Sequence, residues 1–175
     1  MARQLPKRMY VGMDPGADGG MFLVDEKGAL IRFDRINELE SIIEFFKDTK
    51  RIAEHKNLYV TCVFEEYKGD GAANATRHSG MYVGIAMTLC SLFDFRLVRV
   101  APQTWKAHHK IIVHQKKGEP KLSDTERYKA SKERSMDKFR ELYADVNIIF
   151  PRCRKEHEGV AEAGLIAAYR HALGL

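Results

Sequence analysis

The chain has 175 residues, of which 45% are hydrophobic and 30% charged, with a formal net charge of +5. This length fits one domain, expected over residues 1–175, and the composition is that of an ordinary globular protein. No apolar run approaches the roughly 20 residues that cross a bilayer, and the basic N-terminus lacks the apolar stretch of a signal peptide. The three cysteines have no metal-type spacing, so we expect reduced thiols in a cytoplasmic protein without a membrane anchor.

Alternation of apolar segments with turn residues predicts a mixed sheet flanked by helices. The predicted strands cover residues 10–14, 19–25, 29–33, 58–65 and 96–100. The predicted helices cover residues 38–55, 73–93, 103–109, the segment from a Ser123 cap to 143, and 158–173. Asn37 is the expected N-cap of the first helix, and residues 146–150 form a short apolar run that is a possible further strand. The order, a three-strand meander and then alternating helices and strands, predicts an α/β fold with helices on both faces.

Basic residues concentrate between residues 96 and 140, on a chain that is otherwise mildly acidic. A basic segment of this kind suggests a polyanionic partner such as nucleic acid. A solvated lysine-rich helix explains the same pattern without any partner.

Acidic residues stand at the ends of two predicted strands. Asp14 ends the first strand, where it either binds a metal or opens the turn at Pro15-Gly16. Glu65 and Glu66 end the central strand on opposite faces, so only one of them can point at a shared site. Mg²⁺ prefers oxygen ligands, and carboxylates gathered from several elements are the donors that phosphodiester cleavage requires.

The last helix adds two further acids. Glu158 and Glu162 are one turn apart and lie about 40° from each other around the helix axis. Like charges in this arrangement repel unless a cation lies between them. His157 is the rival of Glu158, although it lies about 140° from Glu162, on the wrong side for sharing one ion.

Several short segments resemble motifs of the RuvC-type Holliday-junction resolvases, a branch of the ribonuclease-H-like superfamily. Residues 12–16 (Gly-Met-Asp-Pro-Gly) resemble the first-strand motif Gly-Ile-Asp-Pro-Gly, and residues 64–66 (Phe-Glu-Glu) resemble Ile-Glu-Gln. Residues 102–106 (Pro-Gln-Thr-Trp-Lys) are similar to a segment of phage-type members, and residues 157–163 resemble their motif Asp-His-Gly-Arg-Ala-Glu-Ala. Gly159 departs from the bacterial members, which carry an Asp at that place.

This resemblance implies a ribonuclease-H-like fold with a mixed five-stranded sheet, and a nuclease that cuts four-way or branched DNA. It implies that Mg²⁺, replaceable by Mn²⁺, binds as two ions per active site, and that the protein is a homodimer without a nucleotide cofactor. By this resemblance Glu65 rather than Glu66 is a ligand, and helix geometry favours Glu158 over His157. The implied metal ligands are Asp14, Glu65, Glu158 and Glu162, and Lys106 is the catalytic cation at the scissile phosphate.

The same resemblance assigns DNA contacts to basic residues. Lys68 and Arg77 flank the loop after the central strand, and the residues expected to follow DNA backbones are Lys110, Lys116, Lys117, Lys121, Lys129 and Lys132. Trp105 is expected to anchor the short helix in the core rather than to stack on a base. Gly80 and Gly84, one turn apart, leave a smooth patch for another backbone.

Three other functions fit parts of the pattern. A ribonuclease-H-like nuclease acting on RNA–DNA hybrids or flaps would use the same carboxylates, and a non-catalytic junction-binding protein would need none of them. A sugar-kinase-like or actin-like ATPase also begins with an Asp and a Gly-rich turn, but such folds need two domains and a second phosphate loop, which this sequence lacks.

Overall fold

The computed structural model describes residues 7–16, 18–66, 73–113 and 122–174, with the side chains of 73–78 excepted. Its five-stranded sheet has the order β3-β2-β1-β4-β5, in which β4 is parallel to β1 and β5, while β2 is antiparallel to β1 and β3. The strands are β1 (Arg8–Asp14), β2 (Gly20–Val24), β3 (Leu30–Arg35), β4 (Tyr59–Glu65) and β5 (Arg96–Val100). The helices are α1 (Leu39–Lys56), α2 (Ala73–Phe93), α3 (Pro102–His108), α4 (Asp124–Leu142) and α5 (Glu158–Leu173).

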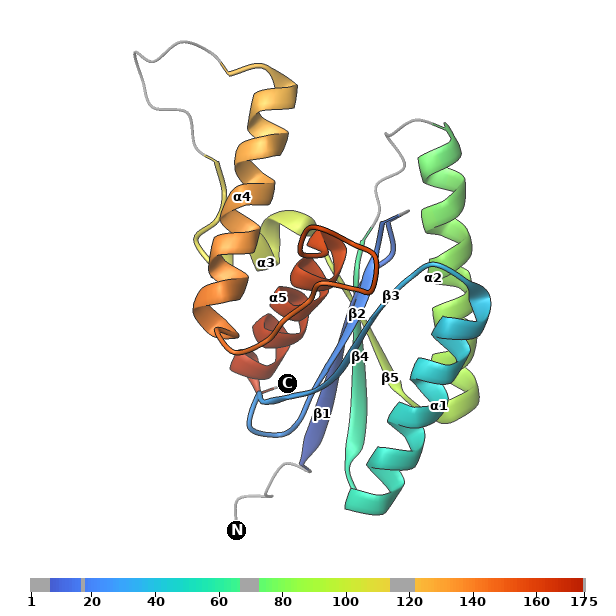
Figure 1. Ribbon diagram of the computed structural model, residues 1–175. Helices are drawn as coiled ribbons and strands as arrows, with labels where there is room; N and C mark the ends of the chain where they lie inside the picture. The colour runs from blue at the N-terminus through green and yellow to red at the C-terminus, as the bar shows by residue number, and fades with distance from the viewer. Residues whose placement is uncertain (1–6, 17, 67–72, 114–121, 175) are drawn as a thin grey trace.

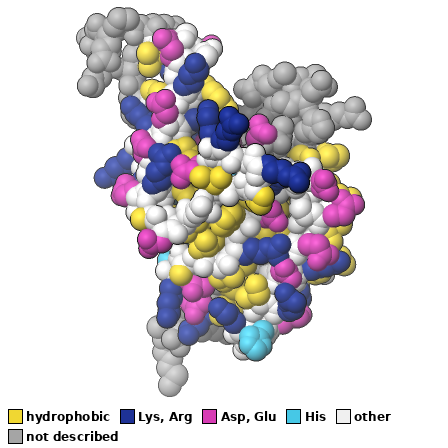
Figure 2. Space-filling model, in the orientation of Figure 1, with side chains coloured by type: hydrophobic (Ala, Val, Ile, Leu, Met, Phe, Trp, Pro, Cys, Tyr) yellow, Lys and Arg dark blue, Asp and Glu magenta, His cyan; other side chains and the backbone are white. Residues whose placement is uncertain are grey.

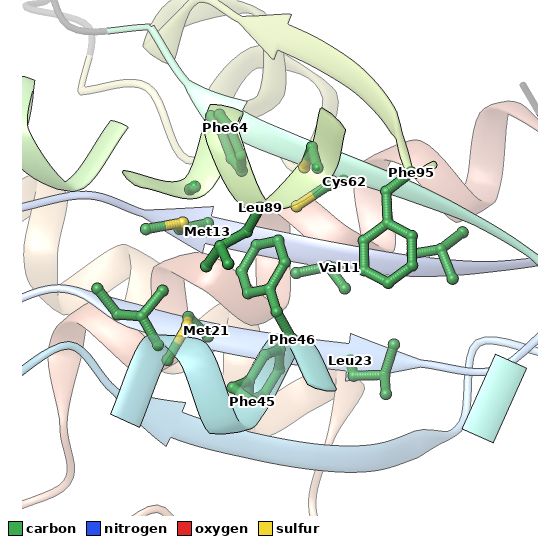
Figure 3. Packing of buried hydrophobic residues seen from close by; sticks show 14 of the residues in the cluster. Val11, Met13, Met21, Leu23, Phe45, Phe46, Cys62, Phe64, Leu89 and Phe95 are labelled. Carbon is green, nitrogen blue, oxygen red and sulfur yellow. The ribbon is translucent and has the colours of Figure 1, made fainter. Parts of the chain in front are cut away.

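Helices cover both faces of the sheet, α1 and α2 on one side and α3, α4 and α5 on the other (Figure 1). The pleat of β1 divides its side chains between the two layers, because successive residues point to opposite faces. Val11 and Met13 enter the core under α1 and α2, where they pack with Phe46 and Leu89 (Figure 3). Tyr10 belongs to the second core, under α5. The predicted α/β fold with a mixed five-stranded sheet is confirmed.

Helix α5 packs against the backbone of the central strands because glycine allows the approach. A Cβ atom on Gly12 would collide with the carbonyl oxygen of Ala163 and lie 2.6 Å from the amide nitrogen of Ala167. The seven residues from Ala161 to Ala167 are all buried, so this helix forms the central layer of its side of the molecule. Two close-packed backbones fix the height of α5 above β1.

Two local predictions are wrong. Residues 146–150 form no strand; Ile148 is fully buried against the α5 side, so the segment supplies its apolar side chains to the core without pairing with an edge of the sheet. The N-cap of α1 is Glu38 rather than Asn37, in extended conformation and without a side-chain cap hydrogen bond. The Ser123 cap of α4 is confirmed, and its hydroxyl accepts a hydrogen bond from the amide of Glu126 at 3.2 Å in a capping box.

Candidate active site

Three predicted acids meet in one pocket at the end of the sheet where α2 and α5 begin (Figure 1). Asp14 and Glu65 are the last residues of the neighbouring parallel strands β1 and β4, so both carboxylates leave the sheet at the same edge. Glu162 reaches the pocket from the second turn of α5. The pocket has a volume of about 440 Å³ and is lined by Asp14, Pro15, Gly16, Asp18, Glu65, Ser79, Lys106, Tyr128, Lys132 and Glu162.

The Asp14 carboxylate stabilises the turn after β1 and also lines the pocket. Its Oδ1 accepts a hydrogen bond from the amide of Gly16 at 3.2 Å, as expected of an Asp that opens a turn. Burial, reinforced by the negative charges of Glu162 and Glu65, raises the pKa of Asp14 to about 7. Deprotonation of Asp14 is thus opposed mainly by its burial and secondarily by the neighbouring carboxylates.

Trp105 holds Glu65 in position. The fully buried indole donates a hydrogen bond from Nε1 to Oε2 of Glu65 at 2.7 Å, which gives a buried indole N–H the partner that it needs. This confirms Trp105 as a core anchor and leaves it no face for a base. Glu66 is exposed, whereas burial raises the pKa of Glu65 and Lys106 opposes this rise. Glu65, not Glu66, is the acid at the pocket.

Glu162 is almost fully buried, with a side-chain exposure of 6%, and it is held by three neighbours. Lys132 Nζ lies 2.6 Å from its Oε2, Lys106 Nζ lies 3.7 Å from its Oε1, and the Ser135 hydroxyl donates to Oε1 at 3.1 Å. Burial would lower the pKa of Lys132, but the carboxylates of Glu162 and Asp14 raise it above its ordinary value. Lys132 therefore carries a positive charge inside the pocket.

The position of Lys132 corrects the sequence interpretation, which placed this residue along the DNA backbone. Its side chain is only 19% exposed and points into the carboxylate pocket from α4. The signal in the sequence was its spacing: Lys132 is one turn before Met136, and Met136 and Phe139 are buried on the inward face of the same helix. A lysine on a buried helical face needs an anionic partner, and Glu162 is that partner.

The structure separates Glu158 from the other predicted ligands. Glu158 is exposed at the first position of α5 and lines a neighbouring groove with Lys129, Met136 and Arg140. His157 is the N-cap of the helix, and its Nδ1 accepts a hydrogen bond from the amide of Val160 at 3.3 Å. Asp18, which sequence reasoning did not consider, lines the pocket instead.

The predicted DNA-binding residues are only partly described. Lys106 lines the pocket, and Lys110 is exposed in the turn after α3. Lys68, Lys116, Lys117, Lys121 and the side chain of Arg77 lie outside the described residues. On the face shown in Figure 2, Lys and Arg are interspersed with Asp and Glu, and α4 pairs Arg127 with Asp124 and Arg140 with Asp137. Two arginines of this segment are thus paired with acids of the same helix.

The pocket suits a hard divalent cation by donor type and charge. Carboxylate oxygens are the ligands that Mg²⁺ and Mn²⁺ prefer, and a cation beside the Asp14 carboxylate would offset the burial and the neighbouring negative charges that raise its pKa. Among the described residues, no three His, Cys, Asp or Glu side chains are grouped closely enough to hold one ion. The ammonium groups of Lys106 and Lys132 lie against Glu162 and serve as its counter-charges.

We expect the stability of the metal-free protein to fall as the pH rises from about 4 to 7. The folded protein keeps a proton on Asp14 up to a pKa of about 7, whereas the unfolded chain releases it near 3.8, so raising the pH favours unfolding across this window. Asp14→Asn removes this penalty and keeps an acceptor for the Gly16 amide. In EDTA at pH 8 the variant should gain on the order of 1 kcal/mol in unfolding free energy, discounted for partial exposure, and little at pH 4.

Urea denaturation at the two pH values measures this difference. Asp145→Asn is the matched control, because Asp145 is exposed and away from the pocket. A gain in the Asp14 variant that is equal at both pH values would contradict the assignment of a raised pKa.

Comparison with known proteins identifies the fold. No family model matches the chain, and no curated protein is similar to it in sequence. The structure of RuvC from Thermus thermophilus superposes with a TM-score of 0.59 at 12% identity, covering 95% of this chain and 96% of that one. T. thermophilus RuvC in complex with a Holliday junction substrate superposes with a TM-score of 0.57 at 13% identity, again covering 95% of this chain and 96% of that one.

The yeast mitochondrial Holliday junction resolvase gives a TM-score of 0.48 at 12% identity, covering 97% of this chain and 80% of that one, too low to add to the argument. The two RuvC superpositions establish that this chain has the ribonuclease-H-like fold, as the sequence predicted. Within the described ranges, no helix has the length and apolar character needed to cross a membrane.

Proposed function

We propose that this protein is a divalent-metal-dependent endonuclease that resolves Holliday junctions or other branched DNA by phosphodiester hydrolysis. One observation carries the proposal: carboxylates from β1, β4 and α5 converge with two lysines in a single pocket, on a fold shared with RuvC. Because one of the superposed RuvC structures holds a Holliday junction substrate, branched DNA is the substrate class that the fold favours.

Asp14, Glu65 and Glu162 would hold Mg²⁺, or Mn²⁺ in its place, as two ions per site. When bound, such ions supply Lewis-acid activation of the attacking water and neutralise charge on the leaving oxygen. Trp105 fixes Glu65, and Ser135 with Lys132 fixes Glu162, so the chain presents its ligands from buried and rigid positions.

The two lysines supply positive charge where a scissile phosphate would lie. Lys106 and Lys132 approach Glu162 from α3 and α4, at 22% and 19% side-chain exposure. In the protein without DNA they neutralise the carboxylates, and a bound phosphate would share them. Preorganised cations of this kind stabilise the charge that develops on phosphorus during cleavage.

Contacts to the DNA backbone are proposed for Lys68, Arg77, Lys110, Lys116, Lys117 and Lys121. Such contacts give affinity that is largely independent of sequence and weakens as salt rises. Lys110 is exposed beside the helix that carries Lys106, which is consistent with a strand entering the pocket along α3.

We further propose a homodimer, formed through the outer face of α2. Gly80 and Gly84 are exposed with no other atoms within 4 Å of an added Cβ, and Met81 and Leu92 on the same helix are 49% and 71% exposed. Glycines with flanking apolar side chains allow two helices to approach closely. Light scattering on the purified protein should give the mass of two chains, and the mass of one chain contradicts this part of the proposal.

The substrate is tested by comparing four DNA forms under identical conditions with Mg²⁺. The four substrates are a four-way junction, a flap, an RNA–DNA hybrid and a linear duplex. We expect the four-way junction to be cut fastest. Preference for the hybrid would make the protein a ribonuclease instead. Junction binding without cleavage of any form would make it a non-catalytic binding protein.

A further inference from the structure

An exposed tyrosine stands at the mouth of the carboxylate pocket. Tyr128, in the second turn of α4, is 63% exposed and lines the same pocket as Asp14 and Glu162. The first turns of α4 project past the start of α5, beyond the body of the sheet (Figure 1). Trp105 is fully buried and donates its indole N–H to Glu65, so it offers no ring to a ligand. Among the pocket-lining residues that the structure describes, Tyr128 is the one aromatic side chain.

Lys132 holds the tyrosine ring at the pocket. It follows Tyr128 by one helical turn, and its Nζ lies 5.6 Å from the centre of the ring, over one face. The same ammonium group forms the 2.6 Å ion pair with Glu162. A cation over an aromatic face is attracted by the negative charge of the ring surface. The contact therefore links the ring to the buried acid, while most of the ring stays in solvent.

The ring also forms one wall of a second hollow, of about 480 Å³, which we call the α4 groove. Tyr128 and Lys132 line both the α4 groove and the carboxylate pocket, so the two hollows are continuous. Tyr128, Lys132 and Met136 follow one another at intervals of four residues and therefore lie along one face of the helix. Met136 is buried and gives the groove an apolar surface beside the aromatic ring.

The charges around the α4 groove favour an uncharged ligand over a phosphate. They are three cations and three carboxylates, those of Lys129, Lys132, Arg140, Glu133, Asp137 and Glu158. Arg140 is paired with Asp137, and Lys132 with Glu162. A phosphate in the groove would meet as much negative as positive charge. A nucleobase is uncharged, and its edges offer donors and acceptors to which carboxylate and lysine side chains hydrogen bond.

We propose that the α4 groove takes an unpaired nucleobase of the branched DNA, stacked on the ring of Tyr128, next to the phosphate that enters the carboxylate pocket. This inference rests on the proposed function for the presence of that phosphate, and it names a residue that distinguishes branched from linear DNA. A base inside a linear duplex reaches the ring only at the cost of unpairing and unstacking. At a branch point the stack is already interrupted, so the cost is smaller.

Fluorescence anisotropy of labelled four-way junctions tests the subsite. Each junction of a set carries one abasic site at a different nucleotide near the branch point, and Ca²⁺ replaces Mg²⁺ so that binding is measured apart from cleavage. Tyr128→Ala should weaken binding of the intact junction about tenfold, the scale of base stacking on an aromatic side chain. Removal of the stacked base should weaken wild-type binding by the same factor. It should leave binding by Tyr128→Ala unchanged, because the two losses are then one interaction.

Tyr59→Ala is the matched control. Tyr59 is 64% exposed but is the first residue of β4, at the opposite end of that strand from Glu65, so its variant should bind every junction like the wild type. Tyr128→Phe keeps the ring and should also bind like the wild type. A linear duplex should be bound equally by the wild type and Tyr128→Ala. Thermal unfolding verifies that the variants are folded, as the exposure of both tyrosines leads us to expect.

Wild-type affinity in Tyr128→Ala, or a loss in this variant that adds to the loss from every abasic site, overturns the subsite while leaving the nuclease proposal intact. A loss in Tyr128→Phe equal to that in Tyr128→Ala assigns the effect to the hydroxyl and overturns stacking. Junction binding by the wild type without cleavage in Mg²⁺ overturns the nuclease proposal, and the anisotropy measurements then still decide on the subsite. Absence of binding to any branched DNA overturns both.

Discussion

Asp14→Asn should abolish Mg²⁺-dependent cleavage of a four-way junction while leaving junction binding within about threefold of the wild-type affinity. The expected loss in cleavage rate is on the order of 10³-fold or more, since the substitution removes one of the proposed charged ligands of the pocket. Binding should persist because backbone contacts depend on surface lysines, and the loss of a negative charge near the phosphate reduces repulsion. Single-turnover cleavage and gel-shift assays measure the two quantities.

The asparagine variant is a narrow test because it keeps the shape of Asp14 and the hydrogen bond from Gly16. Asp145→Asn, a substitution of the same kind on the exposed surface, should cleave like the wild type. A variant at position 14 that still cuts the junction would remove the basis of the site assignment.

Lys132→Ala should lower the cleavage rate by about 100-fold and also destabilise the protein in the absence of metal. Glu162 is 94% buried and would lose its closest counter-charge, at 2.6 Å, which should cost on the order of 2 kcal/mol of unfolding free energy. Added Mg²⁺ should restore part of this stability, because a cation would then neutralise the same carboxylate. Urea denaturation with and without Mg²⁺, beside single-turnover cleavage, measures both effects.

Lys47→Ala is the control for this prediction, since Lys47 lies on α1 across the sheet and is 56% exposed. Lys132→Arg keeps the charge and should recover most of the stability. If Lys132→Ala lowers stability but cleaves at the wild-type rate, then Lys132 serves only to neutralise Glu162 and takes no part in the reaction.

The order of elements was predictable because each strand and helix carries its own local pattern. The short β-branched and apolar strands, the Pro15-Gly16 turn and the Ser123 capping box depend on near neighbours in the chain, and the structure places them as expected. The same local patterns identified Asp14 and Glu65 as candidate site residues, because both are the last residues of strands. Periodicity left Glu65 and Glu66 undecided; in the structure Glu65 faces the pocket, where the buried indole of Trp105, 40 residues later in the chain, donates a hydrogen bond to it.

The remainder of the site depends on packing between distant segments. Lys132 enters the pocket only because α4 lies against α5, and Asp18 does so only because its turn pairs with Gly159. Helix geometry related Glu158 correctly to Glu162 in angle, but it contained no information on which turn of α5 meets the edge of the sheet. The segment 146–150 has strand-like composition, yet it pairs with no strand. Its residue Ile148 is fully buried in the core by side-chain packing alone.

Gly12 has no reactive side chain, but it allows the close approach of α5 to β1 beside the carboxylate pocket. It lies two residues before Asp14 in β1 and directly beneath Ala163, the residue after Glu162. The spacing between Asp14 and Glu162 therefore depends on the close contact between β1 and α5. A methyl group at position 12 would overlap main-chain atoms of Ala163 and Ala167, so Gly12→Ala would push α5 away from β1 and change the spacing of the two acids together with the packing of the core.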